Sequence, residues 1–263
     1  MTALAVVLFA LGAALTFLLP VWALLTWGAR RERRRIARLP VSRCAGVTGP
    51  EKRLCAVEGR SEPGPAGPLL APLSGEPCVW YFSQVVANTT DDGASTRLVW
   101  EAGGAMAFTV RDATGSVLVD GQLVHPDHAS GRTGHRPPVR RVVGEDVRSA
   151  RDSAHLQALI ARGVLSEKSF DRRWWSSTLS WSVREYVLPA GEPLHVQGRP
   201  GIRDGRPLLG AARRKHLVSG RTHAQLAADS EQDVRTGTGC LLLWSVGGPL
   251  LLVAGYLLLM LTR

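Results

Sequence analysis

The stretch ALAVVLFALGAALTFLLPVWALLTW (residues 3–27) decides the fold class of this 263-residue chain, because it carries no charged side chain. A second uncharged run, GTGCLLLWSVGGPLLLVAGYLLLML (residues 237–261), lies near the other end. A bilayer core about 30 Å thick needs roughly 20 apolar residues in a helix, and both runs are long enough. The first run is too long for a cleaved signal peptide, and positive charge follows it instead of preceding it. We therefore expect two transmembrane helices and an integral membrane protein.

The charged residues predict the orientation of these spans. The segment RRERRRIAR (residues 30–38) directly follows the first run, and every charged side chain except Arg263 lies between the two runs. The positive-inside rule then places residues 30–235 in the cytoplasm and both termini outside. We expect residues 30–38 to form a basic juxtamembrane helix that sets the topology and contacts lipid headgroups. A cytoplasmic domain would also keep the four cysteines reduced.

Residues 50–235 are expected to form a β-rich α+β domain. The run CVWYFSQVV (residues 78–86) predicts a buried strand, and alternation on both sides of the turn at residues 112–115 predicts a hairpin. Residues 183–188 and 194–198 read as two strands joined by a tight turn. Residues 121–141 lack periodicity and predict an exposed loop. A helix is expected over residues 152–164, and its apolar stripe comprises Leu156, Leu159, Ile160 and Val164. A last helix, over about residues 221–235, would lead into the second span.

Three segments of this domain resemble one known family. They are PLLAPLSGEPCVWY (residues 68–81), FTVRDATGSV (residues 108–117) and REYVLPAGEPLHVQG (residues 184–198). Together with the order span, domain, span, they resemble the GIDE domain, also called BAM ("beside a membrane"). This is the membrane-flanked module of the mitochondrial-anchored RING ubiquitin ligases of the MULAN/MAPL family. The resemblance covers roughly residues 56–235 and both spans.

The resemblance implies a set of motif residues whose role we expect to be structural. They are Pro72, Ser74, Gly75, Cys78, Tyr81, Asp112, Gly115, Glu185, Gly191 and Gly198. Of these, we expect Gly115 and Gly191 to adopt backbone conformations that other residues avoid.

The sequence departs from these ligases in one respect. Their RING follows the second span and binds two zinc ions through eight Cys and His ligands, whereas Cys44, Cys55, Cys78 and Cys240 are scattered and form no C-x-x-C pair. We therefore expect no RING here, no metal and no cofactor. Because its composition is rich in Arg, Gly and Ala, the chain resembles RING-less bacterial members of the family. This would place it in a bacterial plasma membrane.

Several residues have both a functional and a structural interpretation. Cys78 could be a nucleophile, but a small buried apolar side chain is the better interpretation, and Ser74 fits a turn. His125, His128 and His135 could bind a metal, although solvated loop histidines are more common. Arg172, Arg173, Trp174 and Trp175, together with Trp181, could contact lipid or a partner; packing against the core is favoured, and nucleic acid is the least favoured partner.

Three functions follow from these observations. The first is a cytoplasmic binding or adaptor module that is held at the membrane surface and meets a membrane or cytoplasmic protein there. The second is a ubiquitin-ligase-like transferase acting in protein ubiquitination and organelle organisation, which the resemblance implies but no residue here supports. The third is a lipid-sensing component of the envelope stress response. The catalytic set is expected to be empty.

Overall fold

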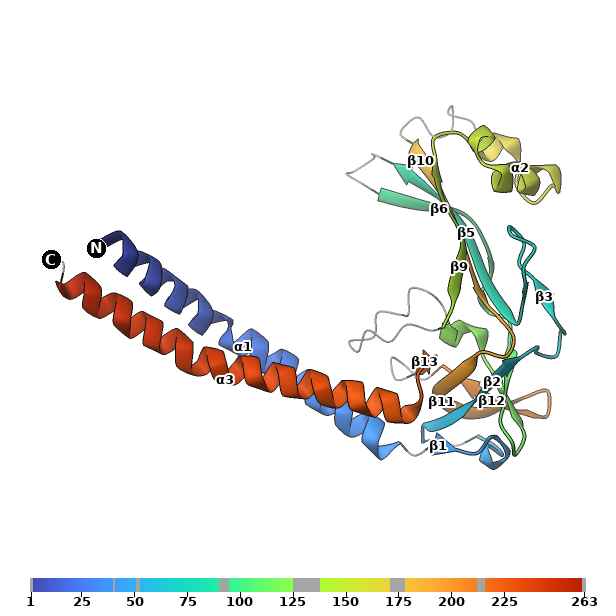
Figure 1. The fold of residues 1–263 in the computed structure, drawn as a ribbon. Coiled ribbons are helices and arrows are strands. Elements are labelled where there is room, and N and C mark those ends of the chain that lie inside the picture. The colour runs from blue at the N-terminus through green and yellow to red at the C-terminus, as the bar shows by residue number, and fades with distance from the viewer. Residues whose placement is uncertain are drawn as a thin grey trace. The chain divides into compact units, whose positions relative to one another are not determined.

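The computed structural model describes residues 2–39, 41–50, 53–89, 95–124, 138–170, 178–211 and 216–261 (Figure 1). The chain divides into two compact units, one formed by Met1–Leu39 with His223–Arg263 and the other by Pro40–Thr222. The first unit is helical and the second is rich in β-strands, and each is described by itself.

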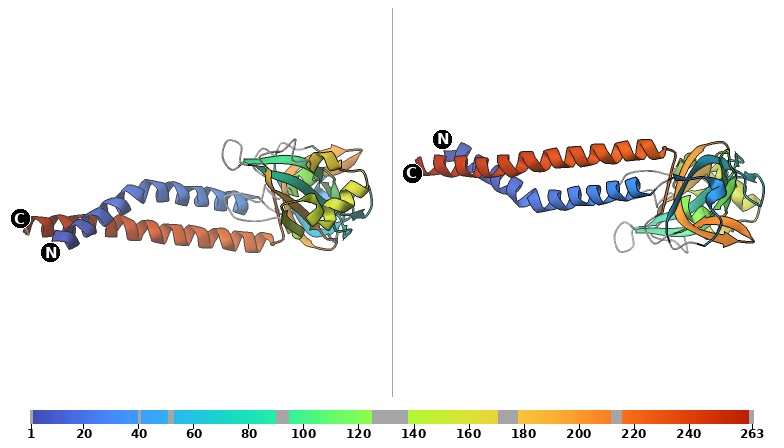
Figure 2. Two further views of the ribbon diagram at one scale, coloured as in Figure 1. Left: turned by 90° about the horizontal axis from the view of Figure 1, so that it is seen from above. Right: turned by 90° about the horizontal axis from the view of Figure 1, so that it is seen from below.

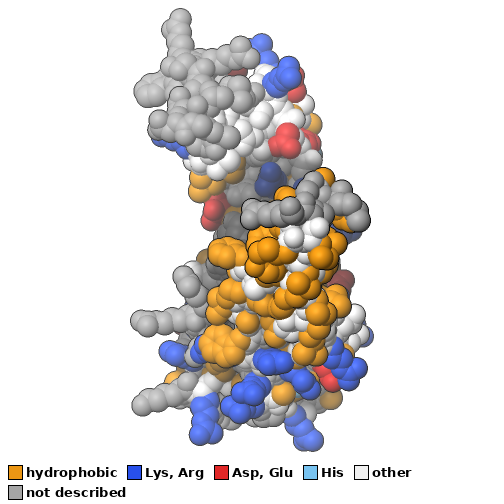
Figure 3. Space-filling view, turned by 90° about the vertical axis from the view of Figure 1, so that its left-hand side faces the viewer, with side chains coloured by type: hydrophobic (Ala, Val, Ile, Leu, Met, Phe, Trp, Pro, Cys, Tyr) orange, Lys and Arg blue, Asp and Glu red, His pale blue; other side chains and the backbone are white. Residues whose placement is uncertain are grey.

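The helical unit consists of α1 (Thr2–Arg38) and α3 (His223–Leu261), which lie side by side in both views of Figure 2. Each helix contains a segment long and apolar enough to cross a membrane. The basic segment at residues 30–38 is the continuation of α1, and the helix expected before the second span is the first part of α3. Hydrophobic side chains form a continuous area on the surface in Figure 3, and a group of Lys and Arg side chains borders its lower end.

Small residues form the contact between α1 and α3. Gly12, Gly248 and Gly255 are buried, and a Cβ atom added to Gly12 would lie 2.5 Å from the backbone nitrogen of Leu252. A Cβ atom on Gly255 would lie 2.6 Å from the backbone nitrogen of Phe9. The two backbones therefore approach so closely that only glycine fits at these positions, which is typical of helices packed within a membrane.

Polar contacts join the charged parts of the same two helices. Arg33 of α1 lies 3.8 Å from Glu231 of α3, which also pairs with Arg235 at 2.9 Å. Arg30 donates a 3.2 Å hydrogen bond to the hydroxyl of Thr238. The contact between α1 and α3 thus changes from charged to apolar along its length.

A closed barrel forms the centre of the β-rich unit. Its strands are β2 (Cys55–Glu62), β7 (Phe108–Arg111), β8 (Ser116–Val119), β11 (Pro193–Arg203) and β12 (Arg206–Gly210). They pair in the ring β2-β7-β8-β12-β11, and β11 returns to β2. All neighbours are antiparallel except β8 and β12, whose parallel ladder joins only Leu208 to Leu118 and Leu209 to Val119. This order, with its one parallel pair, is that of an OB-fold barrel.

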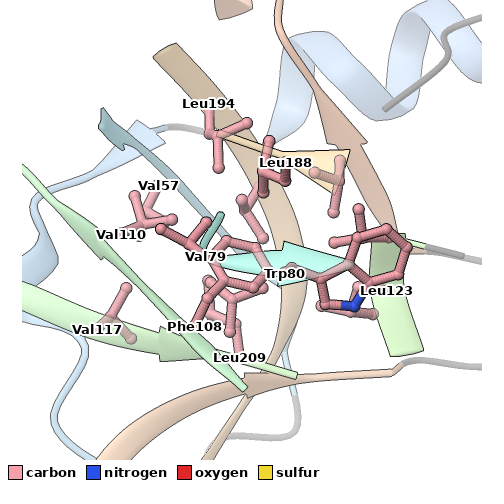
Figure 4. Close-up of a cluster of buried hydrophobic side chains, with 14 of the residues drawn as sticks. Val57, Val79, Trp80, Phe108, Val110, Val117, Leu123, Leu188, Leu194 and Leu209 are labelled. Atoms are coloured by element: carbon pink, nitrogen blue, oxygen red, sulfur yellow. The ribbon is translucent and has the colours of Figure 1, made fainter. Parts of the chain in front are cut away.

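Two short strands, the first and the last of the β-rich unit, pair with strands of the barrel. β1 (Val41–Ser42) pairs with β2 in parallel, and β13 (Leu217–Ser219) pairs with β11. A short 3₁₀ helix, η1 (Cys44–Gly46), follows β1. Apolar side chains from the barrel strands fill the interior, as Figure 4 shows for Val57, Phe108, Val117 and Leu194.

A second sheet is built from two long connections of the barrel. Its strands are β6 (Ser95–Gly103), β5 (Trp80–Thr89), β10 (Thr178–Leu188) and β9 (Arg140–Val147), in that spatial order. The pair β3 (Leu69–Leu70) and β4 (Pro77–Cys78) precedes β5. One face of the sheet packs on α2 (Ala154–Ala161), while its lower end contributes Trp80, Phe82 and Leu188 to the barrel core. The remaining short helices are η2 (Gly121–Val124), η4 (Ala150–Asp152) and η5 (Glu167–Phe170).

The prediction of an exposed loop over residues 121–141 is wrong at both ends of that range. η2 occupies its start, with Leu123 and Val124 buried, and β9 begins at Arg140. The apolar side chains of η2 join the barrel core, and this explains why it is ordered despite its lack of periodicity. Residues 125–137 lie outside the described part of the chain.

The helix expected at residues 152–164 is shorter than predicted. Ser153 caps it by accepting a hydrogen bond from the backbone N–H of Leu156, so α2 begins at Ala154. Gly163, with φ of +71°, ends it. Leu156 and Leu159 are buried as expected, but Val164 lies beyond the helix with 47% of its surface exposed, and Leu165 is buried instead.

The predicted strands are present, but of their pairings only that of β7 with β8 was predicted. The hairpin of β7 and β8 is confirmed, whereas residues 78–86 divide into β4 and β5 around Val79, whose N–H bonds to the carbonyl of Leu188. The strands at residues 183–188 and 194–198 are not partners of each other. β10 belongs to the four-stranded sheet and β11 to the barrel, so the turn between them carries the chain from one sheet to the other.

Candidate functional site

Residues 69–78, here called the strap, cross one face of the four-stranded sheet. β3 and β4 form its two sides, and the turn between them is closed by a 2.9 Å hydrogen bond from Gly75 N–H to the carbonyl of Ala71. Gly75 has φ of +72°, which an L side chain rarely adopts. The strap contains Pro72, Ser74, Gly75 and Cys78 of the predicted motif set. Arg162 donates a hydrogen bond to the carbonyl of Pro72 and so joins the strap to the end of α2.

The carboxylate of Glu185 anchors the strap to β10. Glu185 is 0% exposed, yet its two oxygens accept four hydrogen bonds. The donors are the N–H of Leu73 at 2.9 Å, the N–H of Ser74 at 2.8 Å, and the hydroxyls of Ser74 and Ser83, each at 2.6 Å. Burying a carboxylate is costly unless such donors replace water. The strap and Glu185 therefore depend on each other.

Cys78 and Tyr81 lie beside this carboxylate. Burial, and then the charge of Glu185, raise the pKa of the Cys78 thiol to about 11. Burial also raises the pKa of Tyr81, with smaller contributions from Cys78 and Glu185. The thiolate is the nucleophilic form of cysteine, so Cys78 is protonated and unreactive near neutral pH. The geometry favours the structural interpretation of the motif.

A second anchor joins the turn between β10 and β11 to β2. Gly191 has φ of +84°, as expected, and donates a 2.8 Å hydrogen bond to the carbonyl of Ser61. The Ser61 hydroxyl donates to the carbonyl of Pro189 and accepts from the N–H of Glu192. Arg60 donates a further bond to the carbonyl of Gly191. These contacts fix the point at which the chain leaves one sheet for the other.

Asp112 organises the β7–β8 turn. Its carboxylate accepts hydrogen bonds from the Thr114 hydroxyl, from the N–H groups of Thr114 and Gly115, and from the N–H of Cys44 in η1. These bonds, the Thr114 hydroxyl first, hold the pKa of Asp112 well below its ordinary value. The expectation of an unusual backbone at Gly115 is wrong, because its φ is not positive. The Asp112 side chain closes the turn without a left-handed residue.

The structure thus gathers six of the predicted motif residues at the strap and disperses the other four. Pro72, Ser74, Gly75, Cys78, Tyr81 and Glu185 lie at the strap. Gly191 lies at the sheet-crossing turn, and Asp112 and Gly115 at the β7–β8 turn. Gly198 lies where β11 meets β12, since a Cβ atom there would be 3.0 Å from the carbonyl oxygen of Gly210.

The predicted basic and aromatic surface lies almost entirely outside the described residues. This applies to Arg172, Arg173, Trp174 and Trp175, and also to His125, His128 and His135. Trp181 is described, and it belongs to the core: it is 4% exposed and packs edge-on against Phe170 at 4.8 Å between ring centroids. Trp181 is therefore excluded from that surface.

The sequence did not single out three further polar residues of the β-rich unit. Ser83 and Ser61 each complete an anchor, and nothing in the sequences of β5 and β2 distinguishes them from other polar strand residues. His195 is buried on β11, with Nδ1 3.1 Å from a Glu58 oxygen and Nε2 2.9 Å from the side-chain nitrogen of Gln197. Nothing in the local sequence predicts that contact, because Glu58 lies on β2, far away in the chain.

Among the described residues, no group of three or more His, Cys, Asp or Glu side chains is placed to hold a metal ion. Comparison of the chain with protein-family models, with curated proteins and with solved structures finds no match in any of the three.

Proposed function

We propose that this chain is an integral membrane protein of the GIDE/BAM type that acts as a binding or adaptor module. In this proposal α1 and α3 cross the bilayer as a pair and hold both ends of the β-rich domain at the cytoplasmic surface. There the domain meets a membrane or cytoplasmic protein. The resemblance in residues 68–81, 108–117 and 184–198 supports the family, and the helix pair supports the membrane location.

The observation that carries the membrane location is how α1 and α3 distribute large and small side chains. Glycines and Ala5 are buried between the helices, whereas Leu24 is 68% exposed and Leu243 is 71% exposed. A helix pair in water would bury its large apolar side chains instead. Lipid reverses this preference, because helices associate there through close backbone packing.

The arginines support the proposed orientation. They follow the apolar part of α1 within one continuous helix, and the exposed Trp27 lies just before them with Arg31 over its ring. Tryptophan favours the membrane–water interface, and arginine favours the cytoplasmic side. Both ends of residues 40–222 would then emerge on one side of the bilayer.

A non-catalytic role fits the chemistry of the strap. Its conspicuous nucleophile, Cys78, is buried and protonated, and its carboxylate is fully engaged by four donors. These groups fix a surface rather than act on a substrate.

Membrane-impermeant maleimide labelling tests the topology. One variant would carry Arg206→Cys, an exposed position of the domain, and another a cysteine added after Arg263. We expect the added terminal cysteine to react in intact cells and the domain cysteine only after permeabilisation. Labelling of the domain cysteine in intact cells would reverse the proposed orientation, and recovery of the protein in the soluble fraction would refute the membrane location.

Quantitative mass spectrometry of the full-length protein, purified from its own membranes in mild detergent, tests the adaptor role. An unrelated two-span protein expressed at the same level is the control. A protein that co-purifies in stoichiometric amount with this chain alone would support the proposal. Purification with lipid only would contradict the adaptor role and favour lipid sensing.

A further inference from the structure

The four-stranded sheet has a second face, opposite the strap, which is here called the open face because, among the described residues, it carries exposed side chains such as Glu101 and Arg184. Successive residues of a strand point to opposite faces. On β10, Val183 and Glu185 point to the face that packs on α2 and the strap, so Ser182 and Arg184 point to the other face. Arg184 is exposed there, and its register partners are Gln84 on β5 and Gly144 on β9.

A β-bulge brings a second arginine to this face. The β9–β10 register shifts between Glu185 and Tyr186, so Val143 pairs with Glu185 while Arg141 pairs with Tyr186. In a regular register Val142 would pair with Tyr186, and Arg141 would then pair with Val187 and point to the strap side. Bulges commonly redirect a side chain in this way, often beside a functional site.

Gly144 leaves space for the redirected side chain. A Cβ atom on Gly144 would lie 2.9 Å from Nε of Arg141 and 3.1 Å from its Cζ. The guanidinium of Arg141 therefore occupies the place of the side chain that Gly144 lacks, directly across the ladder from Arg184. Directly opposed Cβ positions lie about 5 Å apart, so the guanidinium of Arg141 lies beside the point at which the Arg184 side chain leaves β10.

No acidic side chain of the described residues forms an ion pair with either arginine. The acid of β9 on this face is Asp146, which accepts a hydrogen bond from the Ser182 hydroxyl. Glu101 points to the same face, but Gln84 stands between it and Arg184 in the register. Two adjacent like charges repel each other unless an anion lies between them.

We propose that Arg141 and Arg184 form a binding site for a phosphoryl group on the open face of the four-stranded sheet. A carboxylate has two oxygens, which one guanidinium fork can satisfy. Two forks match an anion with more oxygens, as in a phosphate mono- or diester. The amide of Gln84 is the adjacent uncharged donor on β5. This site is independent of the proposed adaptor role, since it requires only the fold of the β-rich unit.

Titration of the full-length protein with inorganic phosphate tests the site. The protein would be held in a phosphate-free detergent, and binding followed by ³¹P NMR. We expect saturable binding that Arg141→Gln and Arg184→Gln each weaken about tenfold or more, because each removes a charged hydrogen-bonding partner. Arg206→Gln is the matched control, since it removes one exposed charge from the barrel and should change affinity less than twofold.

Gly144→Ala separates geometry from net charge. It keeps both arginines but places a methyl group where Arg141 lies, so the flexible side chain must move and affinity should fall. The thermal unfolding midpoint of each variant would verify its fold. The proposal is overturned if no saturable binding occurs, or if Arg206→Gln weakens it as much as Arg184→Gln does.

Nanodiscs distinguish the two sources of a phosphoryl group. Phosphate binding would be measured in phosphatidylcholine discs with and without phosphatidylglycerol. Weaker phosphate binding in the discs that contain phosphatidylglycerol would identify a lipid headgroup as the ligand. An unchanged affinity for phosphate would identify a soluble phosphoester.

Discussion

At the scale of single residues, hydrogen-bond donors stabilise the buried charge of Glu185. Four donors from the strap and from β5 surround its carboxylate, and two of them are backbone N–H groups. A backbone donor is kept by every substitution except proline, which would also restrict the chain. Changing the acceptor is therefore the most direct way to measure how strongly the strap is held.

We predict that Glu185→Gln destabilises the β-rich unit. Glutamine has nearly the same shape, but it has one acceptor oxygen and places an NH₂ group against existing donors. Loss of charge-assisted bonds should cost about 3 kcal/mol. For a domain of this size, that loss of unfolding free energy lowers the thermal unfolding midpoint by roughly 6–12 °C. Tryptophan fluorescence on heating measures this midpoint. Glu101→Gln, at an exposed position, is the control, and equal midpoints for both variants would contradict the anchoring role.

The Asp112 turn predicts a dependence of stability on pH. Its folded-state pKa lies below the ordinary value of 3.8, so its contribution is present above that value and is lost as pH falls through the folded pKa. We expect the difference in unfolding midpoint between the native protein and Asp112→Asn to be constant above about pH 5 and to shrink below about pH 4. Unfolding scans between pH 2.5 and 7 would measure it. A difference that grows on acidification would contradict the assignment.

The two buried thiols predict an alkylation pattern. Burial, then the nearby Asp112, raise the pKa of Cys44 to about 12, and burial with Glu185 raises that of Cys78 to about 11. We therefore expect iodoacetamide at pH 8 to leave both unmodified in the folded protein and to modify both after denaturation. Peptide mass spectrometry reads out each site. Rapid modification of folded Cys78 would instead support a nucleophilic role.

At the scale of elements, the turn from β10 to β11 decides how the two sheets are connected. We predict that Gly191→Ala destabilises the fold by about 1–2 kcal/mol, because the residue has φ of +84° and L side chains avoid this region. Gly46→Ala is a matched control. Neither added Cβ would meet an atom within 4 Å, but Gly46 has an ordinary φ. Equal unfolding midpoints for the two variants would show that this backbone conformation is unimportant.

The same turn shows what sequence patterns can and cannot predict. Alternation and the Pro-Ala-Gly turn correctly predict the strands around residues 183–188 and 194–198. Their partners depend on which apolar faces meet in space, and alternation with a period of two contains no such information. For the same reason Glu185 could be named as a motif residue, while its contact with Ser83, 102 residues away, could not be predicted. The bulge at Val142 is equally invisible, since it depends on the partner strand.

At the scale of the whole molecule, the charge-free runs at residues 3–27 and 237–261 predict the two long apolar helices. The sequence does not indicate which glycines face the partner helix. Gly247 and Gly248 are adjacent, yet only a Cβ atom on Gly248 would meet α1, at 2.9 Å from the Thr16 hydroxyl oxygen.

These two glycines provide a matched test of helix packing. We predict that Gly248→Leu separates α1 from α3 and that Gly247→Leu has little effect. Trp22 and Trp244 pack edge-on at 5.1 Å, so cysteines at positions 22 and 244 can report the contact through a short bifunctional maleimide. Cross-linking should fall several-fold in the Gly248→Leu protein alone. Equal yields in both variants would refute the glycine-mediated contact.

The closed ring of the barrel has a mechanical consequence. The chain enters the β-rich unit through β1 and leaves it through β13, which pair with the neighbouring strands β2 and β11. Tension between the two helices would therefore load the ladder between β2 and β11, which joins Cys55 to Gly198 at one end and Arg60 to Pro193 at the other. The four-stranded sheet does not carry this force, because β5 and β6 belong to the connection from β2 to β7, and β9 and β10 belong to the connection from β8 to β11. A pull on α1 and α3 would leave the face of this sheet that carries Arg141 and Arg184 undistorted until the barrel itself opens.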